Sequence, residues 1–402
     1  MDTTIALYSH DSVGLGHARR NRALAYAMAE QLPALTGGSV GGLLIAGHPD
    51  AGRDPLPEGW DWLVLPGMTR TRTGYGARRL GMAPDAVRDL RSATIGAALA
   101  ALEPDLFIAD RHPFGIDGEL RPVLADLRAR GTATVLGLRE VLDTPRVAAA
   151  EWEALGGAQL VASFLDAIWV YGDEHVYDPR LTGELPPALA QKATATGYLA
   201  RGRPAGRPAS PERTSPKPPP PYVLTVLGGG SDGAELARPA AAARVPEGHR
   251  HLLITGPQMP EQDIAEIRDL AAATSPATTV VRSAPDVPEL IAEAAAVVCT
   301  GGYNTMAEVM ATDTPALVVP RSRRRQEQPR RALALAAVGA VETREAAAVT
   351  GEQIARWWRR AVTGRTDRGH IDLDGLDAVP RLAARLLPTA VPAHPEVSHH
   401  VG

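Results

Sequence analysis

The sequence predicts an α/β protein made of two doubly wound, Rossmann-like domains that face each other across a cleft. Both halves alternate short apolar runs with alanine-rich helical segments, a proline-rich stretch separates them, and a glycine-rich loop follows the first apolar run of each. A chain of 402 residues also exceeds one ordinary hydrophobic core. We therefore divide it into a first domain (1–200), a linker (201–221), a second domain (222–387) and a disordered tail (388–402).

Apolar runs of strand length recur throughout both halves. The strands expected in the first half are 4–9, 40–47, 61–66, 106–110, 133–138 and 167–172. Those expected in the second half are 222–229, 251–256, 278–283, 295–300 and 315–320. The first helix is expected over 18–31, where Leu24, Ala27, Met28 and Leu32 share one face. In such domains ligands bind beyond the carboxyl ends of the strands, so functional residues are expected there.

The overall composition excludes several classes of protein. A formal net charge of -4 argues against a generic nucleic-acid binder. The single cysteine, Cys299, lies in an apolar run and is expected in the core, so an intrachain disulfide is impossible. The N-terminus does not resemble a signal peptide, and no stretch offers the ~18 apolar residues of a membrane span. We expect a cytoplasmic protein that requires neither a cofactor nor a metal.

The first candidate motif is GLGH, residues 14–17, directly after the first predicted strand. Gly14 and Gly16 would let a ligand approach the backbone closely. His17 can titrate near neutral pH, which makes it a candidate base. The structural alternative is that His17 only begins a surface helix. Asp11, in the same loop, would orient His17 or act as the base itself, unless it is a turn residue.

The second motif is GGGSDG, residues 228–233, after the first strand of the second half. Its glycines fit G-x-G-x-x-G, but the next strand ends in Gly256 instead of an acidic residue, and no Walker lysine is present. The pattern therefore favours a phosphate loop over a dinucleotide site, with a tight turn as the structural alternative. The residues assigned to the phosphate side are Gly228, Gly229, Gly230, Ser231 and Gly256.

The third motif begins at residue 299 and reads CTGGYNTMAEVM. Thr305 and Glu308 fit the capping box T-x-x-E, so a structural role competes with a functional one. In the functional interpretation, Gly302 and Asn304 lie against a diphosphate. Glu308 then accepts hydrogen bonds from both hydroxyl groups of a ribose, which a carboxylate does well.

Residues 301–332, GGYNTMAEVMATDTPALVVPRSRRRQEQPRRA, resemble the nucleotide-sugar site of family 28 glycosyltransferases. Residues 14–25 resemble the N-terminal loop of a less studied bacterial branch of predicted glycosyltransferases. The resemblance implies the GT-B architecture, with Glu308 on the ribose and Glu327 or Gln328 on the donor sugar. The residues that would line the diphosphate are Gly301, Gly302, Asn304 and Thr305. Where the family commonly has His-Gln or Gln-Gln, this chain has Glu327 and Gln328, so the identity of the donor sugar stays open.

The resemblance also implies a reaction. A hexose-type sugar would pass from a nucleoside diphosphate donor, preferably a UDP-sugar, to a hydroxyl group of a small-molecule or lipid-linked acceptor. Inverting transfer needs a base for the acceptor hydroxyl, which would be His17. Backbone N–H groups and helix N-termini would stabilise the leaving diphosphate without an obligatory metal. Asp110, His112 and Arg139 follow strands of the first domain and are expected at the acceptor site.

Two alternatives to a transferase remain at this stage. A nucleotide-sugar hydrolase of the same fold would use the same histidine to activate water. A regulatory sensor would bind the nucleotide sugar without turnover, although binding alone needs no base.

Paired Trp357 and Trp358 beside arginines either touch a membrane surface or, more simply, pack a helix against the second domain.

Overall fold

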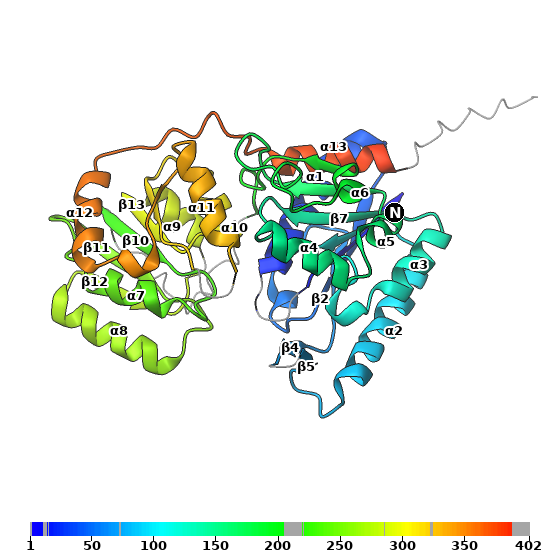
Figure 1. The fold of residues 1–402 in the computed structure, drawn as a ribbon, viewed down its shortest axis with the longest axis horizontal. Coiled ribbons are helices and arrows are strands. Elements are labelled where there is room, and N and C mark those ends of the chain that lie inside the picture. The colour runs from blue at the N-terminus through cyan, green and yellow to red at the C-terminus, as the bar shows by residue number, and fades with distance from the viewer. Residues whose placement is uncertain are drawn as a thin grey trace, which may run out of the picture.

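The protein folds into two parallel sheets flanked by helices, which confirms the predicted fold class (Figure 1). The computed structural model describes residues 2–10, 14, 16–71, 74–204, 219, 221–284, 286–321 and 325–387. Asp11, most of the proposed linker and the proposed tail lie outside the described residues, so their predictions stay predictions.

The first sheet has seven parallel strands in the order β3-β2-β1-β6-β7-β8-β9. Its strands are β1 (Thr3–Tyr8), β2 (Val40–Ala46), β3 (Trp60–Val64), β6 (Leu106–Asp110), β7 (Ala133–Arg139), β8 (Ala167–Tyr171) and β9 (Ala193–Ala195). The chain winds outward from β1 in one direction and then from β6 in the other. The switch point between β1 and β6 is where such sheets bind ligands.

The second sheet repeats this arrangement with six parallel strands in the order β12-β11-β10-β13-β14-β15. Its strands are β10 (Tyr222–Val226), β11 (Arg250–Ile254), β12 (Thr278–Val281), β13 (Ala296–Cys299), β14 (Ala316–Val318) and β15 (Glu342–Thr343). Its switch point lies between β10 and β13, and the two glycine-rich motifs of the second half directly follow these strands.

Four strands were not predicted from the sequence. β9 and β15 extend the sheets at their edges, and β4 (Met68–Arg70) pairs with β5 (Tyr75–Ala77) as a separate antiparallel hairpin. Each of these strands is only two or three residues long. Such short segments carry no measurable hydrophobic periodicity.

Helices cover both sheets (Figure 1). Those of the first half are α1 (Gly16–Thr36), α2 (Pro84–Leu102), α3 (Arg121–Ala129), α4 (Pro145–Ala154), α5 (Ala158–Ser163) and α6 (Pro187–Ala190). Those of the second half are α7 (Ala234–Ala241), α8 (Glu261–Thr274), α9 (Val287–Glu293), α10 (Tyr303–Met310), α11 (Glu327–Ala337), α12 (Gly351–Ala361) and α13 (Gly375–Leu386). Short 3-10 turns are η1 (Ala51–Arg53), η2 (Ile116–Gly118) and η3 (Ala346–Ala348).

Both faces of the central strands are buried, as expected for parallel sheets. In β1, Ile5 and Leu7 belong to one apolar cluster while Ala6 and Tyr8 belong to another. The first of these clusters also includes Leu224 of β10, so apolar packing runs continuously from one sheet to the other. The two domains therefore share part of their hydrophobic core.

The predicted face of the first helix is confirmed, since Leu24, Ala27, Met28 and Leu32 are all buried in α1. The C-terminal helix α13 packs along α1, so the chain returns to the first domain after building the second (Figure 1). Gln31 of α1 also donates a hydrogen bond to Asp377 of α13 at 2.7 Å.

Helix α12 confirms the simpler interpretation of the paired tryptophans. Thr350 and Gln353 form a capping box, and Trp357 and Trp358 are buried against the second sheet. Cys299 is also a core residue, and burial raises the pKa of its thiol to about 11. Within the described ranges, no helix combines the length and apolar character that crossing a membrane requires.

Candidate functional site

The switch points of the two sheets are in direct contact. Asn304, in the first turn of α10, donates a hydrogen bond from Nδ2 to the carbonyl oxygen of Gly16 at 2.9 Å. A Cβ atom on Gly14 would lie 3.1 Å from Nε2 of Gln258, a residue of the second domain. The first glycine motif therefore lies against the second domain. The sequence analysis expected this motif to face a donor bound to that domain.

His17 forms a polar cluster with Asp110 and Arg20. Its Nδ1 atom lies 3.2 Å from Oδ2 of Asp110, which ends β6 and is fully buried. Arg20 donates to the same carboxylate from Nε at 3.0 Å and from Nη2 at 2.8 Å and 2.6 Å. Asp110 has no exposed surface and contacts His17 and Arg20, and its expected place at the acceptor site stays a prediction.

The electrostatics of this cluster favour a neutral His17 beside an ionised Asp110. Burial lowers the pKa of His17, and the attraction of Asp110 offsets only part of this effect. Burial opposes ionisation of Asp110, but Arg20 and His17 outweigh it and bring its pKa to about 2. Nδ1 of His17 lies 3.2 Å both from Oδ2 of Asp110 and from Nη2 of Arg20. The tautomer that carries its proton on Nδ1 donates to the carboxylate and leaves the lone pair of Nε2 free.

Two further histidines lie beside His17. The ring of His10 lies 5.9 Å from that of His17 and 4.0 Å from that of His112. Burial lowers the pKa of His10 to about 3 and that of His112 well below its usual value. The hydroxyl of Tyr75, on β5, lies 3.3 Å from Nε2 of His10. His112 was expected from the sequence at the acceptor site. His10 was not singled out, because a polar residue at a strand end is a weak signal by itself.

Glu308 is buried on α10. The structural alternative for it, a capping box formed with Thr305, is wrong. The N-cap of α10 is Gly302 and makes no side-chain cap, while Thr305 lies within the helix, so Thr305 and Glu308 form no capping box. The guanidinium of Arg203 lies 3.8 Å from Glu308 and donates to Oδ1 of Asn304 at 3.2 Å. Arg203 was not predicted as a site residue, because it lies in the segment 201–221, whose composition indicated only a linker.

Two glycines in the loops after β10 and β11, Gly230 and Gly256, are required by close packing. Gly230 has a φ of +85°, and a Cβ atom there would lie 2.2 Å from the carbonyl oxygen of Thr255. Gly256 has a φ of +92°, and its Cβ would lie 2.5 Å from the carbonyl oxygen of Gly228. The loops after β10 and β11 therefore interlock. Gly228 itself, with a φ of +60°, has open space where a Cβ would be.

The remaining residues predicted on the donor side also make close contacts with neighbouring loops and strands. Gly229 packs near Gln258, Gly301 has a φ of +80° beside Val318, and Ser231 donates to Asp232 at 3.3 Å. Gln328 accepts a hydrogen bond from the backbone N–H of Arg321 at 3.2 Å. These contacts bring the two glycine-rich motifs of the second half to one edge of its sheet.

Glu327, the first residue of α11, is tied to both domains. Its Oε1 atom accepts from Nη1 of Arg139 at 2.6 Å and from Nη1 of Arg331 at 3.0 Å. Burial opposes ionisation of Glu327, but the two arginines prevail and bring its pKa to about 2. Arg139 ends β7 of the first domain, so a residue expected at the acceptor site contacts a residue expected on the donor sugar.

Other charged contacts cross the same boundary. Arg331 binds Glu140 through two hydrogen bonds, at 2.6 Å and 3.1 Å, and both side chains are fully buried. The ring of Tyr303, on α10, lies 5.4 Å from the guanidinium of Arg20 and 5.6 Å from that of Arg331. One aromatic ring thus lies between Arg20, which binds Asp110, and Arg331, which binds Glu327.

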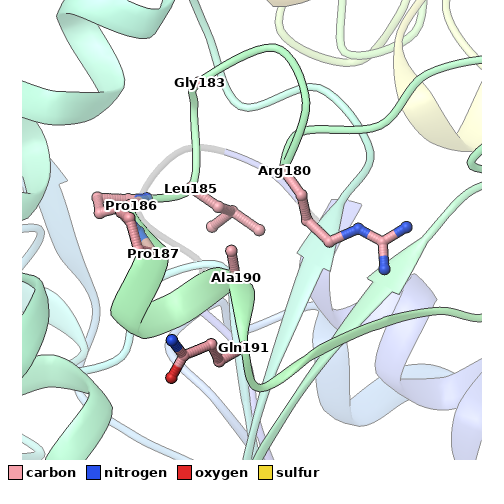
Figure 2. Close-up of a pocket in the computed structure, with 7 residues that line it drawn as sticks. All are labelled: Arg180, Gly183, Leu185, Pro186, Pro187, Ala190 and Gln191. Carbon is pink, nitrogen blue, oxygen red and sulfur yellow. The ribbon is translucent and has the colours of Figure 1, made fainter.

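A cavity of about 620 Å³ lies elsewhere, in the first domain (Figure 2). Its lining comes from the single segment between β8 and β9 and consists of Arg180, Gly183, Leu185, Pro186, Pro187, Ala190 and Gln191. None of the predicted site residues lines it. Among the residues with described positions, no cluster of His, Cys, Asp or Glu is arranged to hold a metal ion.

Residues 223–367 match the Glycosyltransferase family 28 C-terminal domain. The second domain is family 28-like. The match includes both glycine-rich motifs of the second half and confirms the resemblance identified from residues 301–332. It ends before α13, which packs on the first domain.

Curated relatives agree with the family match. The UDP-N-acetylglucosamine--N-acetylmuramyl-(pentapeptide) pyrophosphoryl-undecaprenol N-acetylglucosamine transferase of Paramagnetospirillum magneticum is 35% identical over 138 residues, covering 33% of this chain and 36% of that protein. The equally named protein of Mesorhizobium japonicum is 32% identical over 139 residues, covering 34% and 37%. The similarity thus spans little more than a third of these relatives.

Solved structures extend the likeness to the whole fold. MurG of Acinetobacter baumannii has a TM-score of 0.56 at 15% identity, covering 95% of this chain and 99% of its own. The glycosyltransferase SnogD from Streptomyces nogalater has a TM-score of 0.57 at 16% identity, covering 97% of both chains. At these identities the likeness shows the fold alone, and that fold is GT-B.

Proposed function

We propose that this family 28-like protein is a glycosyltransferase that moves a hexose-type sugar from a nucleoside diphosphate donor to a hydroxyl acceptor. The observation that carries the proposal is the hydrogen bond from Asn304, in the family 28 motif, to the carbonyl oxygen of Gly16, the residue before His17. A candidate base and a candidate donor site therefore belong to one site. The transferases among the curated relatives and solved structures support this class and do not favour the hydrolase.

His17 acts as the general base in this proposal. Its neutral imidazole takes the proton of the acceptor hydroxyl through Nε2 while that oxygen attacks the anomeric carbon. Asp110 fixes the tautomer and stabilises the imidazolium that forms, and Arg20 keeps Asp110 ionised. Attack opposite the leaving diphosphate inverts the configuration at the anomeric carbon. His112 and Tyr75 border the acceptor position.

The second domain binds the donor. Glu308 accepts hydrogen bonds from the ribose hydroxyls, and the backbone N–H groups around Gly301, Gly302 and the loop after β10 bind the diphosphate. Glu327 and Gln328 contact the sugar. The N-terminus of α10, which begins directly after the glycine pair, favours the negative charge of the leaving group. We propose that UDP is the nucleotide, as the names of the curated relatives suggest, and that no metal is required.

Donor binding and nucleotide release test this function. The purified protein is incubated with UDP-, dTDP- and GDP-sugars, first without acceptor and with or without a chelator, and compared with His17→Ala and Glu308→Ala. We expect one class of donor to bind with only slow release, unaffected by the chelator, and Glu308→Ala to weaken nucleotide binding. We expect His17→Ala to bind the donor normally but to lose transfer once an acceptor is supplied.

Two outcomes would overturn the proposal. If Glu308→Ala binds the nucleotide as tightly as the wild type, the assigned ribose site is wrong. If donor is consumed rapidly without acceptor and this activity disappears in His17→Ala, the protein is a hydrolase. The stereochemistry of the product, read by NMR of the anomeric proton, tests inversion.

A further inference from the structure

The turn after β6 contains a buried non-glycine residue in the left-handed region of backbone conformation. Arg111 has a φ of +70° and is 4% exposed. Within the described ranges, the other two non-glycine residues with a positive φ, Glu103 and Asp117, are exposed. A side chain in this region is energetically unfavourable and persists only where the surrounding structure enforces it. We therefore expect the contacts that enforce it at Arg111 to serve the neighbouring site.

This conformation turns the chain between two residues of the candidate site. The backbone N–H of His112 donates to the carbonyl oxygen of Asp110 at 2.9 Å, which closes a three-residue turn of a rare and strained type. The backbone N–H of Arg111 donates to the carbonyl oxygen of Gly137, on β7, at 2.7 Å. Asp110, directly before the turn, contacts His17. The backbone of Arg111 thus sets the direction in which the chain leaves Asp110 and enters His112.

Glu151, on α4, binds the side chain of Arg111. Nη2 of Arg111 donates to its Oε2 atom at 2.7 Å, and Nη2 of Arg325 donates to its Oε1 atom at 2.7 Å. Burial opposes ionisation of Glu151, but the two guanidinium groups outweigh it and lower the pKa of its carboxyl group below the ordinary value. Arg325 lies in the second domain, two residues before Glu327. Each oxygen of Glu151 is thus bound by a different domain.

We propose that Arg111 and Glu151 are positioning residues that hold the turn 110–112 in the conformation that directs Asp110 to His17. Arg325 makes this hold depend on the contact between the domains, so the second domain contributes to the orientation of the base. The inference rests on the proposed function for the role of His17 and adds residues that act through Asp110. Loss of the ion pair should let the turn relax, because a contact that offsets its strain is then missing.

The pKa of His17, measured by NMR titration of the full chain with isotope-labelled histidine, tests the proposal without a substrate. If the turn relaxes, Asp110 moves away from His17, and the pKa of His17 falls toward its value in Asp110→Asn. Arg111→Met and Glu151→Gln should both show this fall. Their direct charge effects have opposite signs, because losing a cation raises the pKa of a histidine and losing an anion lowers it. A fall in both variants therefore reports positioning.

Further variants and readouts separate positioning from folding. Arg111→Lys can keep an ion pair with Glu151 and should restore most of the wild-type pKa of His17, whereas Arg325→Gln should produce a smaller fall. Glu153→Gln, at an exposed position on α4, is the matched control and should behave like the wild type. In the transfer assay, kcat of Arg111→Met and Glu151→Gln should fall about tenfold or more, with unchanged affinity for UDP. Thermal unfolding establishes that each variant is folded.

Each contrary result has a distinct meaning. The positioning role is overturned unless the pKa of His17 falls in both folded variants, Arg111→Met and Glu151→Gln. It is also overturned if Glu153→Gln shows the same fall, or if either variant loses affinity for UDP. A wild-type pKa in Arg325→Gln would overturn the contribution of the second domain. If UDP does not bind the wild type, the proposed nucleotide site is wrong, while the NMR titration still decides whether the ion pair holds the turn.

Discussion

At the scale of single residues, the site depends on which groups carry charge. Arg20 and His17 keep Asp110 ionised in a position without solvent contact, and burial keeps His17 neutral. A histidine whose pKa lies below its ordinary value stays competent as a base in mildly acidic solution. The pH dependence of turnover therefore reports on this cluster directly.

We predict that kcat/KM rises with pH and that the midpoint of this rise lies below the ordinary histidine pKa of about 6.5, because burial lowers the pKa of His17. Asp110→Asn removes the charge that raises this pKa, so the acidic limb should move to still lower pH. The plateau should also fall, since the imidazole loses its fixed tautomer. His17→Ala should lower kcat by about 10²–10⁴-fold. Rates measured across pH with a saturating donor check both effects.

Asp126→Asn, an exposed carboxylate on α3, is the matched control and should leave the profile unchanged. An acidic limb that moves to higher pH in Asp110→Asn would contradict the assignment of Asp110 as the partner of His17.

At the scale of elements, β11 carries a buried histidine within the second sheet. His251 is fully buried, lies 2.9 Å from the hydroxyl of Thr225 and 3.2 Å from that of Thr278, and packs against the ring of Trp358. Burial lowers its pKa to about 3. The folded protein thus excludes a proton that the unfolded chain binds readily.

We predict that the stability of the protein falls as the pH is lowered from about 6.5 toward about 3. The unfolded histidine binds a proton below about pH 6.5, whereas the folded one does so only near pH 3. The contribution is therefore fully present above pH ~6.5 and is lost progressively as the pH falls toward ~3. At about pH 5 this residue alone lowers the free energy of unfolding by about 2 kcal/mol. Urea unfolding at about pH 5 and pH 8 measures the change.

His251→Gln cannot titrate and should show a smaller loss of stability between the two pH values. His370→Gln, at an exposed position, serves as the control. An equal loss in wild type and His251→Gln would assign the pH dependence to other groups.

Helix α13 is the element that returns from the second half of the chain to the first domain. Val379 is fully buried in the cluster that also holds Leu24 and Met28 of α1. We predict that Val379→Asp lowers the free energy of unfolding by more than about 3 kcal/mol, because it buries an unpaired charge. Arg381→Asp, on the exposed side of α13, should change it by less than about 1 kcal/mol. Chemical unfolding compares the two, and similar values would contradict the packing of α13 on α1.

At the scale of the whole molecule, the two domains are joined by buried charge as well as by apolar packing. Arg331 connects Glu140 of the first domain with Glu327 of its own helix, and all three side chains are almost completely buried. Breaking such a pair from one side leaves a buried charge without compensation.

We predict that Arg331→Met destabilises the protein by about 3–5 kcal/mol, because Glu140 then stays buried without its partner. Glu140→Gln in the same background should recover part of this loss, since it removes the isolated charge. A double-mutant cycle on the free energy of unfolding measures the coupling. Additive losses would show that the pair does not act across the boundary.

Much of the fold could be predicted from the sequence. Alternating apolar runs predicted eleven of the strands, and the face of α1 followed from residues such as Leu24 and Met28, because periodicity reports burial locally. It also placed His17, Glu308 and Glu327 beyond the strand ends. The capping interpretation of Thr305 was wrong, because the helix begins at Tyr303, one turn earlier than the pattern suggested.

By itself, the sequence determined the α/β class and the glycine motifs at the strand ends, because both depend on residues near one another in the chain. Only the tertiary structure brought Asp110 to His17, Arg139 to Glu327 and Arg331 to Glu140. Each of these pairs joins residues separated by at least ninety positions, and their partnership depends on where the strands lie in their sheets and how the sheets meet. Local patterns predict that a polar residue ends a strand, but the choice of its partner is made by the fold.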